Sequence, residues 1–135
     1  MNEEKEMEGP RVPTESPHKG KTGLARVWNA CFHSLDGLRA AFRHEHAFRQ
    51  EVLLAAILIP AAFLLQPSGA GRALMVGSVL LVLVVELLNS AVEAAVDRAS
   101  VESHPLAKRA KDIGSAAVFL SLINVLVVWL LVLFG

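Results

Sequence analysis

Polar side chains recur inside an otherwise apolar stretch of the sequence, LVLVVELLNSAVEAAVDR at residues 81–98. At roughly 100° of turn per residue, an α-helix over this stretch places them on one face, within an arc of roughly 100°. These side chains are Glu86, Asn89, Ser90, Glu93 and Asp97. The other positions are apolar or small, so the remaining faces can contact lipid or neighbouring helices. The spacing predicts a helix with one face kept for chemistry or for a partner.

The energetics of this polar face restrict what it can be. An ionised side chain near the middle of a bilayer costs on the order of 2.5 to 3.5 kcal/mol, and two carboxylates on one face also repel each other. Three interpretations compete: a carboxylate pair that binds a cation, a proton relay in a transporter, or a structural hydrogen-bonding stripe between helices. The structural interpretation fits Glu86 and Glu93 poorly, because neutral Ser or Asn would join helices at lower cost.

The composition is that of a small membrane protein. Hydrophobic residues make up 53% of the 135 residues, which is too apolar for an ordinary soluble domain of this size. The 13 basic residues balance the 13 acidic ones, so the charge gives no indication of nucleic acid as a partner. Because Cys31 is the single cysteine, an internal disulfide and a multi-cysteine metal site are excluded. Cofactor chemistry must rest on carboxylates and histidines.

Three apolar segments are candidates for membrane spans, which predicts an all-α membrane protein. The first is the shortest and contains Pro60, so it reaches spanning length only if the helix includes residues 47–51. The second apolar segment, residues 73–96, contains Glu86 and Glu93 as its only charges, and the third, residues 113–135, contains none. The three expected transmembrane helices cover about residues 47–66, 71–96 and 112–134.

Two different regions precede the spans. Residues 1–22 are rich in charge, Pro and Gly and predict a disordered tail. Residues 24–44 carry apolar side chains at alternating spacings of four and three, which predicts an amphipathic helix on the membrane surface. A helix packed only against the protein's own spans is the alternative. Residues 23–135 are then one membrane domain.

Lysine and arginine counts predict the orientation. The linker after the first span holds one basic residue, whereas residues 97–112 hold four and the other eight precede the first span. We therefore expect the N-terminus and residues 97–112 to be cytoplasmic and the C-terminus to face outward. Glu93 would then lie near the cytoplasmic side, with Glu86 roughly 10 Å deeper.

Glu51 favours the cation interpretation. It begins the first span and would lie at about the membrane depth of Glu93, so two helices present carboxylates at one level. Oxygen ligands of this kind suit a hard cation such as Mg²⁺, and Glu86 would remain free as a base. The basic side chains Lys108, Arg109 and Lys111 add positive charge beside the same site. Carboxylates, a metal and basic residues at a cytoplasmic interface predict phosphoryl transfer.

A second carboxylate near the first span, with a histidine on each side, is a candidate for a different metal site. Glu45 lies between His44 and His46 in the segment RHEHAF. Residues two apart do not share a helical face, so we expect a solvated interfacial stretch there rather than a metal site.

Three motifs carry a resemblance to a known family. They are FRQE at 48–51, ELLNSAVEAAVDR at 86–98 and RAKDIGSAAV at 109–118. With this spacing and three spans, the sequence closely resembles the bacterial integral-membrane diacylglycerol kinase family, from roughly Thr22 to the C-terminus. The resemblance implies a homotrimer in the bacterial cytoplasmic (inner) membrane, with active sites shared between subunits. It also implies transfer of the γ-phosphoryl group of MgATP to diacylglycerol, giving phosphatidic acid.

The resemblance also implies roles for individual residues. Glu86 matches the family's general base, and Asn89 would orient the hydroxyl or the γ-phosphate. Glu51 and Glu93 match metal-binding glutamates. Ser90 and Asp97 are expected to support the same polar face. The positions that match nucleotide contacts are Arg26, Glu102, His104, Lys111 and Asp112.

Two alternatives stay open. Some members of the same family phosphorylate undecaprenol, although DIGSAAV at 112–118 is more like the diacylglycerol type. Outside the enzymes, a small proton or cation transporter subunit could use Glu86 and Glu93 as a relay. No acidic residue continues such a path through residues 73–85, which disfavours the relay.

Overall fold

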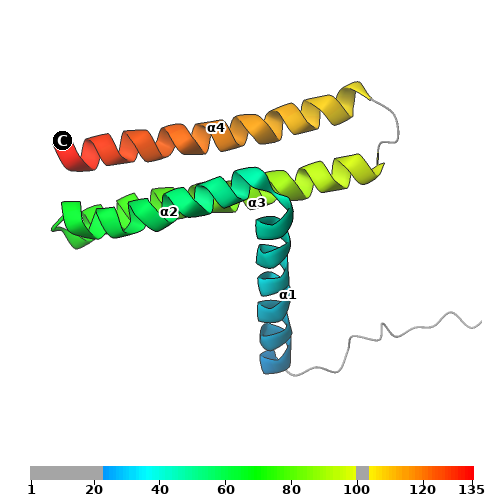
Figure 1. Cartoon of the computed structure of the whole chain (residues 1–135), viewed down its shortest axis with the longest axis horizontal. Coiled ribbons are helices and arrows are strands. Elements are labelled where there is room, and N and C mark those ends of the chain that lie inside the picture. The colour runs from blue at the N-terminus through cyan, green and yellow to red at the C-terminus, as the bar shows by residue number, and fades with distance from the viewer. Residues whose placement is uncertain (1–22, 100–103) are drawn as a thin grey trace, which may run out of the picture. The chain divides into compact units, whose positions relative to one another are not determined.

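The computed structural model describes residues 23–99 and 104–135, and these form four helices (Figure 1). The elements in chain order are α1 (Gly23–His44), α2 (His46–Leu65), α3 (Gly69–Ala99) and α4 (Pro105–Phe134). This confirms the prediction of an all-α protein. The predicted tail, residues 1–22, lies outside the described residues.

Helices α2, α3 and α4 are each long and apolar enough to cross a membrane, which confirms three candidate spans. At 20 residues, α2 is about 30 Å long, the thickness of a bilayer's hydrocarbon core. It begins at His46, so it includes residues 47–51, and it continues through Pro60. The 31 residues of α3 and the 30 of α4 give about 45 Å each, so both extend beyond the hydrocarbon.

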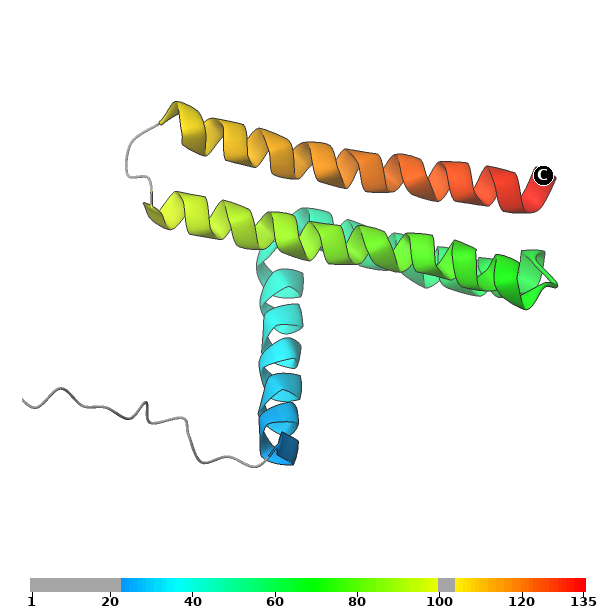
Figure 2. The ribbon, with the colours of Figure 1, turned by 180° about the vertical axis from the view of Figure 1, so that it is seen from behind.

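Within Gly37–Gly135, which form one compact unit, α3 is the central helix. It packs antiparallel against both α2 and α4; α4 runs alongside α3 in both views, in which α2 overlaps α3 (Figures 1 and 2). Many apolar side chains on the other faces of these helices are exposed in the single chain. Surfaces of this kind suit lipid or further protein.

The core between α2 and α3 is narrow, and the spacing of its buried residues on α3 leads to Glu86. Phe48, Ala55 and Ala62 recur every seven residues along α2, and the two alanines let the backbones approach closely. On α3, Met75, Val79 and Val82 are buried at spacings of four and three. The next position of this stripe, four residues after Val82, is Glu86.

The α2–α3 turn ties three helix ends together. The Gln66 side-chain amide donates from Nε2 to the carbonyl oxygen of Val132 on α4 (3.0 Å), while its Oε1 accepts from the Ser68 backbone N–H (3.1 Å). Arg72 Nε donates to the Gln66 carbonyl oxygen at 2.6 Å. A Cβ atom at Gly71 would lie 2.6 Å from Gln66 Cγ, so any larger residue here would displace the Gln66 side chain. The turn thus fixes the helices at the end farthest from Glu51.

Helix α1 covers the range in which the sequence predicts a surface helix. Trp28 and Phe32 form an edge-to-face pair with ring centroids 5.3 Å apart. At the α1–α2 junction, Arg49 Nη1 donates to the carbonyl oxygens of Phe42 (3.1 Å) and Arg43 (3.0 Å). Arg49 thereby satisfies carbonyls in the last turn of α1. That α1 lies on a membrane surface stays a prediction.

Candidate functional site

Glu86 is buried on the packed face of α3, with 4% of its surface exposed. The carboxylates of Glu45, Glu51 and Glu93 are each close enough to Glu86 for their charges to interact. Four carboxylates are therefore gathered from the α1–α2 junction, from α2 and from α3. Because like charges at short range repel, cations or protons are needed to relieve the repulsion.

Glu51 presents an unsatisfied oxygen to this site. Its Oε2 is buried and has no hydrogen-bond partner among the described residues. A buried carboxylate oxygen without a partner is costly, so this atom suits a cation or a hydroxyl donor from a ligand. Glu51 is thus available for chemistry.

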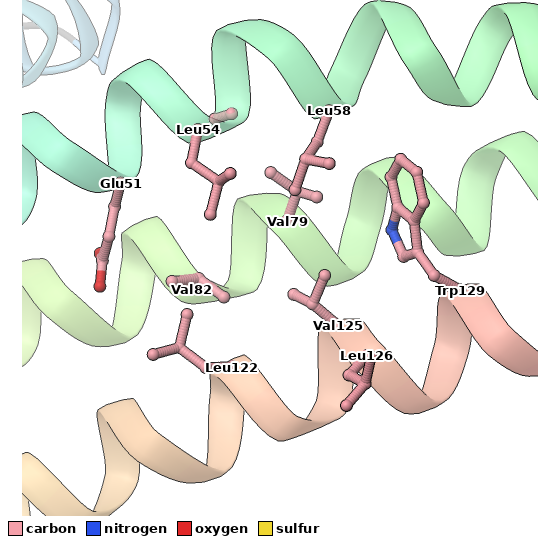
Figure 3. A pocket seen from close by; sticks show the side chains of 10 residues that line it. Glu51, Leu54, Leu58, Val79, Val82, Leu122, Val125, Leu126 and Trp129 are labelled. Atoms are coloured by element: carbon pink, nitrogen blue, oxygen red, sulfur yellow. The ribbon is translucent and has the colours of Figure 1, made fainter.

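An apolar pocket of about 260 Å³ begins at Glu51 and ends at Trp129 (Figure 3). Helices α2, α3 and α4 all contribute to it, and Glu51 supplies the only carboxylate in its lining. The lining residues are Glu51, Leu54, Ala55, Leu58, Val79, Val82, Leu122, Val125, Leu126 and Trp129. Such a lining suits a hydrocarbon chain with a polar group at the Glu51 end.

Asn89 and Glu93 are one helical turn apart on α3 and are joined. Asn89 Nδ2 donates to Glu93 Oε1 at 3.0 Å, so the amide orients one carboxylate oxygen. Asn89 Oδ1 is buried and has no hydrogen-bond partner in the described part of the chain. Both side chains are half-buried, as is Ser90, whereas Asp97 further along the helix is exposed. The predicted polar face therefore runs from the buried Glu86 out to an exposed end.

A second pocket, of about 480 Å³, separates this part of α3 from α4. Asn89 is the one polar side chain that lines it, and Gly114 lies on its α4 wall. The lining residues are Val85, Leu88, Asn89, Val92, Ala110, Ile113, Gly114 and Ala117.

Ion pairs occupy the polar ends of α3 and α4. Lys111 Nζ donates to Asp97 Oδ1 at 2.6 Å, which links the two helices, and Lys108 Nζ donates to Asp112 Oδ2 at 2.5 Å along α4. The structure thus brings the predicted nucleotide contact Lys111 to the predicted polar face. The two carboxylates and Lys108 are well exposed, and Lys111 is partly exposed. Both ion pairs are therefore weak, and each lysine could exchange its carboxylate partner for another anion.

The structure describes two of the remaining predicted nucleotide contacts, His104 and Arg26. His104 is the N-cap of α4, where its Nδ1 accepts from the Leu106 N–H at 3.2 Å. Arg26 is exposed on α1, in the part of that helix before Gly37. Glu102 lies outside the described residues. The structure therefore pairs Lys111 with Asp97 and Asp112 with Lys108, and the grouping of the five predicted contacts stays a prediction.

The assignment of Glu51 and Glu93 as metal ligands stays a prediction. Among residues 23–99 and 104–135, no three His, Cys, Asp or Glu side chains are grouped closely enough to hold a metal ion. Glu51 and Glu93 nonetheless both belong to the carboxylate cluster around Glu86.

Glu45 is the member of the cluster that sequence analysis missed. It is the N-cap of α2, with extended backbone angles (φ −104°, ψ 116°), and its side chain makes no capping hydrogen bond. Its carboxylate is thereby left to interact with Glu86. The available signal was an acidic residue directly before a helix start, six residues ahead of Glu51.

Comparison with known proteins gives consistent matches over most of the chain. The sequence model of the family described as prokaryotic diacylglycerol kinase matches residues 32–133. The diacylglycerol kinase of Pseudomonas aeruginosa is 59% identical over 120 residues, covering 89% of this chain and 98% of the relative. That of Haemophilus influenzae is 53% identical (80% and 92% covered), and that of Escherichia coli K12 is 44% identical (84% and 93%). The family match includes the four clustered glutamates.

Proposed function

The chain belongs to the prokaryotic diacylglycerol kinase family, and on this premise we propose that it transfers the γ-phosphoryl group of ATP to the hydroxyl group of diacylglycerol, giving phosphatidic acid. The observation that carries the proposal is the buried Glu86 with three further carboxylates around it, beside an apolar pocket.

Glu86 is the proposed general base. It accepts the proton of the lipid hydroxyl as that oxygen attacks the γ-phosphorus, and the bond from phosphorus to the departing ADP oxygen breaks. Burial on the α3 face limits access of water, which would otherwise compete as the acceptor. Asn89 orients the reacting group beside it. Since the transition state is loose, positioning and charge neutralisation matter more than the strength of the base.

Mg²⁺ is the proposed metal, and the chemistry of the oxygen donors supports it. Glu51 Oε2 is unpaired, and Glu93 is held by Asn89 through one oxygen only, so hard oxygen donors are available. Glu51 and Glu93 are the expected ligands. When bound, the ion neutralises negative charge on the phosphates.

The nucleotide is proposed to bind at the polar ends of α3 and α4. Lys111 exchanges Asp97 for a phosphate oxygen, which a weak exposed pair permits. The remaining contacts expected from the family resemblance are Arg26, Glu102, His104 and Asp112.

The pocket between Glu51 and Trp129 is proposed to receive part of an acyl chain. Its lining is apolar along α2, α3 and α4, and the carboxylate stands at one end. A lipid whose chain enters the pocket would present its polar end to the carboxylate cluster.

The proposed assembly is a homotrimer in the bacterial inner membrane. The N-terminus and residues 97–112 are cytoplasmic, the C-terminus faces outward, and α1 lies on the membrane surface. Support comes from the exposed apolar faces of the three long helices and from the clustering of Lys and Arg. Active sites shared between subunits would bring in ligands that one chain does not group by itself.

The test is phosphoryl transfer by the purified protein in mixed micelles with γ-labelled MgATP. Diacylglycerol and undecaprenol are supplied separately, and Glu86→Gln serves as the inactive control. We expect label in phosphatidic acid. Label only in polyprenyl phosphate would change the acceptor, and no label in either lipid from folded wild-type protein would overturn the proposed function.

A further inference from the structure

Gly114 leaves room for one particular side chain. A Cβ atom added at Gly114 on α4 would collide with Asn89 Oδ1 on α3, and it would lie 3.3 Å from Asn89 Cγ. Outside the α4 backbone and the residues next to Gly114, the three heavy atoms nearest to that position all belong to Asn89. The lack of a side chain at Gly114 therefore makes room for the Asn89 amide. It does not serve to let the two helix backbones approach each other.

The other side of the same amide is fixed. Asn89 Nδ2 donates to Glu93 Oε1 at 3.0 Å, while Oδ1 has no hydrogen-bond partner among the described residues. Because Oδ1 and Nδ2 belong to one planar group, pushing Oδ1 away must also move Nδ2. The alternative, a shift of α4 away from α3, would enlarge the pocket that already separates them.

We propose that Gly114 is a positioning residue: its lack of a side chain admits the Asn89 amide between α3 and α4, in the orientation from which Nδ2 holds Glu93 Oε1. The inference rests on the proposed function, in which Glu93 is a ligand of Mg²⁺. Groups that orient a metal ligand typically change metal affinity 10- to 100-fold (roughly) when they are mutated.

The first test compares Gly114→Ala with Gly77→Ala. Gly77 lies on α3, and a Cβ atom there meets no other atom within 4 Å, so this variant controls for a glycine-to-alanine change in a span. Binding of Mn²⁺ to protein with a non-hydrolysable ATP analogue is measured by electron paramagnetic resonance. We expect the Mn²⁺ affinity of Gly114→Ala to fall roughly 10-fold or more and that of Gly77→Ala to match the wild type. Wild-type affinity in Gly114→Ala would overturn the inference.

A double-variant cycle separates positioning from helix packing. With Asn89→Ala, the group that the new Cβ meets is gone, so adding Gly114→Ala to this background should change Mn²⁺ affinity less than about twofold. An equal loss in both backgrounds would show that Gly114 acts without Asn89. If Gly114→Ala alone does not fold, the double variant should recover folding, and its failure to do so would also overturn the inference.

A readout without metal separates this inference from the proposed function. The side-chain amide resonances of Asn89, assigned by their loss in Asn89→Ala, should shift in Gly114→Ala and stay in place in Gly77→Ala. Unmoved resonances in Gly114→Ala would overturn the inference even if the wild type phosphorylates diacylglycerol. If the wild type transfers no phosphoryl group, the proposed function is wrong. The Asn89 resonances would still test whether Gly114 positions the Asn89 amide.

Discussion

Lys111 on α4 reaches across to α3, where its Nζ lies 2.6 Å from Asp97 Oδ1. The pair joins the two helices at the end where ATP is proposed to bind. Because the Asp97 side chain is 65% exposed and that of Lys111 40%, solvent screens the attraction and the pair contributes little to stability. Because the pair joins two helices, its main effect is to orient the Lys111 ammonium group.

Replacing Lys111 by Met should raise the KM for ATP by about 10-fold or more, because a phosphate loses a charge-assisted hydrogen bond. The melting temperature should change little. Arg98→Met, which removes a positive charge from the exposed end of α3, serves as the control and should leave the KM within about twofold. Equal effects of the two variants would mean that Lys111 acts only through general charge.

Replacing Glu86 by Gln should preserve folding and ATP binding while kcat falls by roughly 10² to 10⁴, the usual contribution of a general base. The change also removes one of four clustered carboxylates, so the protein without metal should be as stable as the wild type or more stable. Single-turnover rates and thermal unfolding in the same detergent measure both effects. An unimpaired chemical step would remove Glu86 from the mechanism.

Replacing Glu93 by Gln should raise the Mg²⁺ concentration needed for half-maximal activity, with a smaller change in the rate at saturating Mg²⁺. The cause is the loss of one charged oxygen ligand, since the amide keeps the shape of the side chain but carries no negative charge. Glu45→Gln tests whether the carboxylate that the structure adds to the cluster around Glu86 also affects the Mg²⁺ requirement. A metal dependence that stays the same in both variants would make the two glutamates structural.

Replacing Gln66 by Ala should destabilise the protein with little effect on kcat. The variant leaves the part-buried Val132 carbonyl oxygen without its partner, a loss of about 1 kcal/mol, whereas water can replace the partner of the exposed Ser68 N–H. Thermal unfolding monitored by circular dichroism should show the lower stability. A fall in kcat at unchanged stability would contradict the assignment of Gln66 to the scaffold alone.

The helices were predictable because their signals are local. Hydropathy and length indicated three spans, and a 3.6-residue period put Asn89 and Glu93 on one face, where the structure joins them by a hydrogen bond. Glu45 was not predictable in this way, because its carboxylate meets Glu86 only through the α1–α2 junction. The fit of Gly114 to Asn89 depends on the register of two separate helices, which no local pattern encodes.

The tie at Gln66 has a mechanical consequence for the other end of the helices. Val132 and Lys111 are about 30 Å apart along α4, so a tilt of about 5° about the tied end would displace Lys111 by nearly 3 Å. The other end of α4 is joined to α3 by the chain between residues 99 and 105 and by the exposed ion pair between Lys111 and Asp97. A small change in the angle of α4 at the Gln66 tie would therefore move Lys111 farther than it moves Val132.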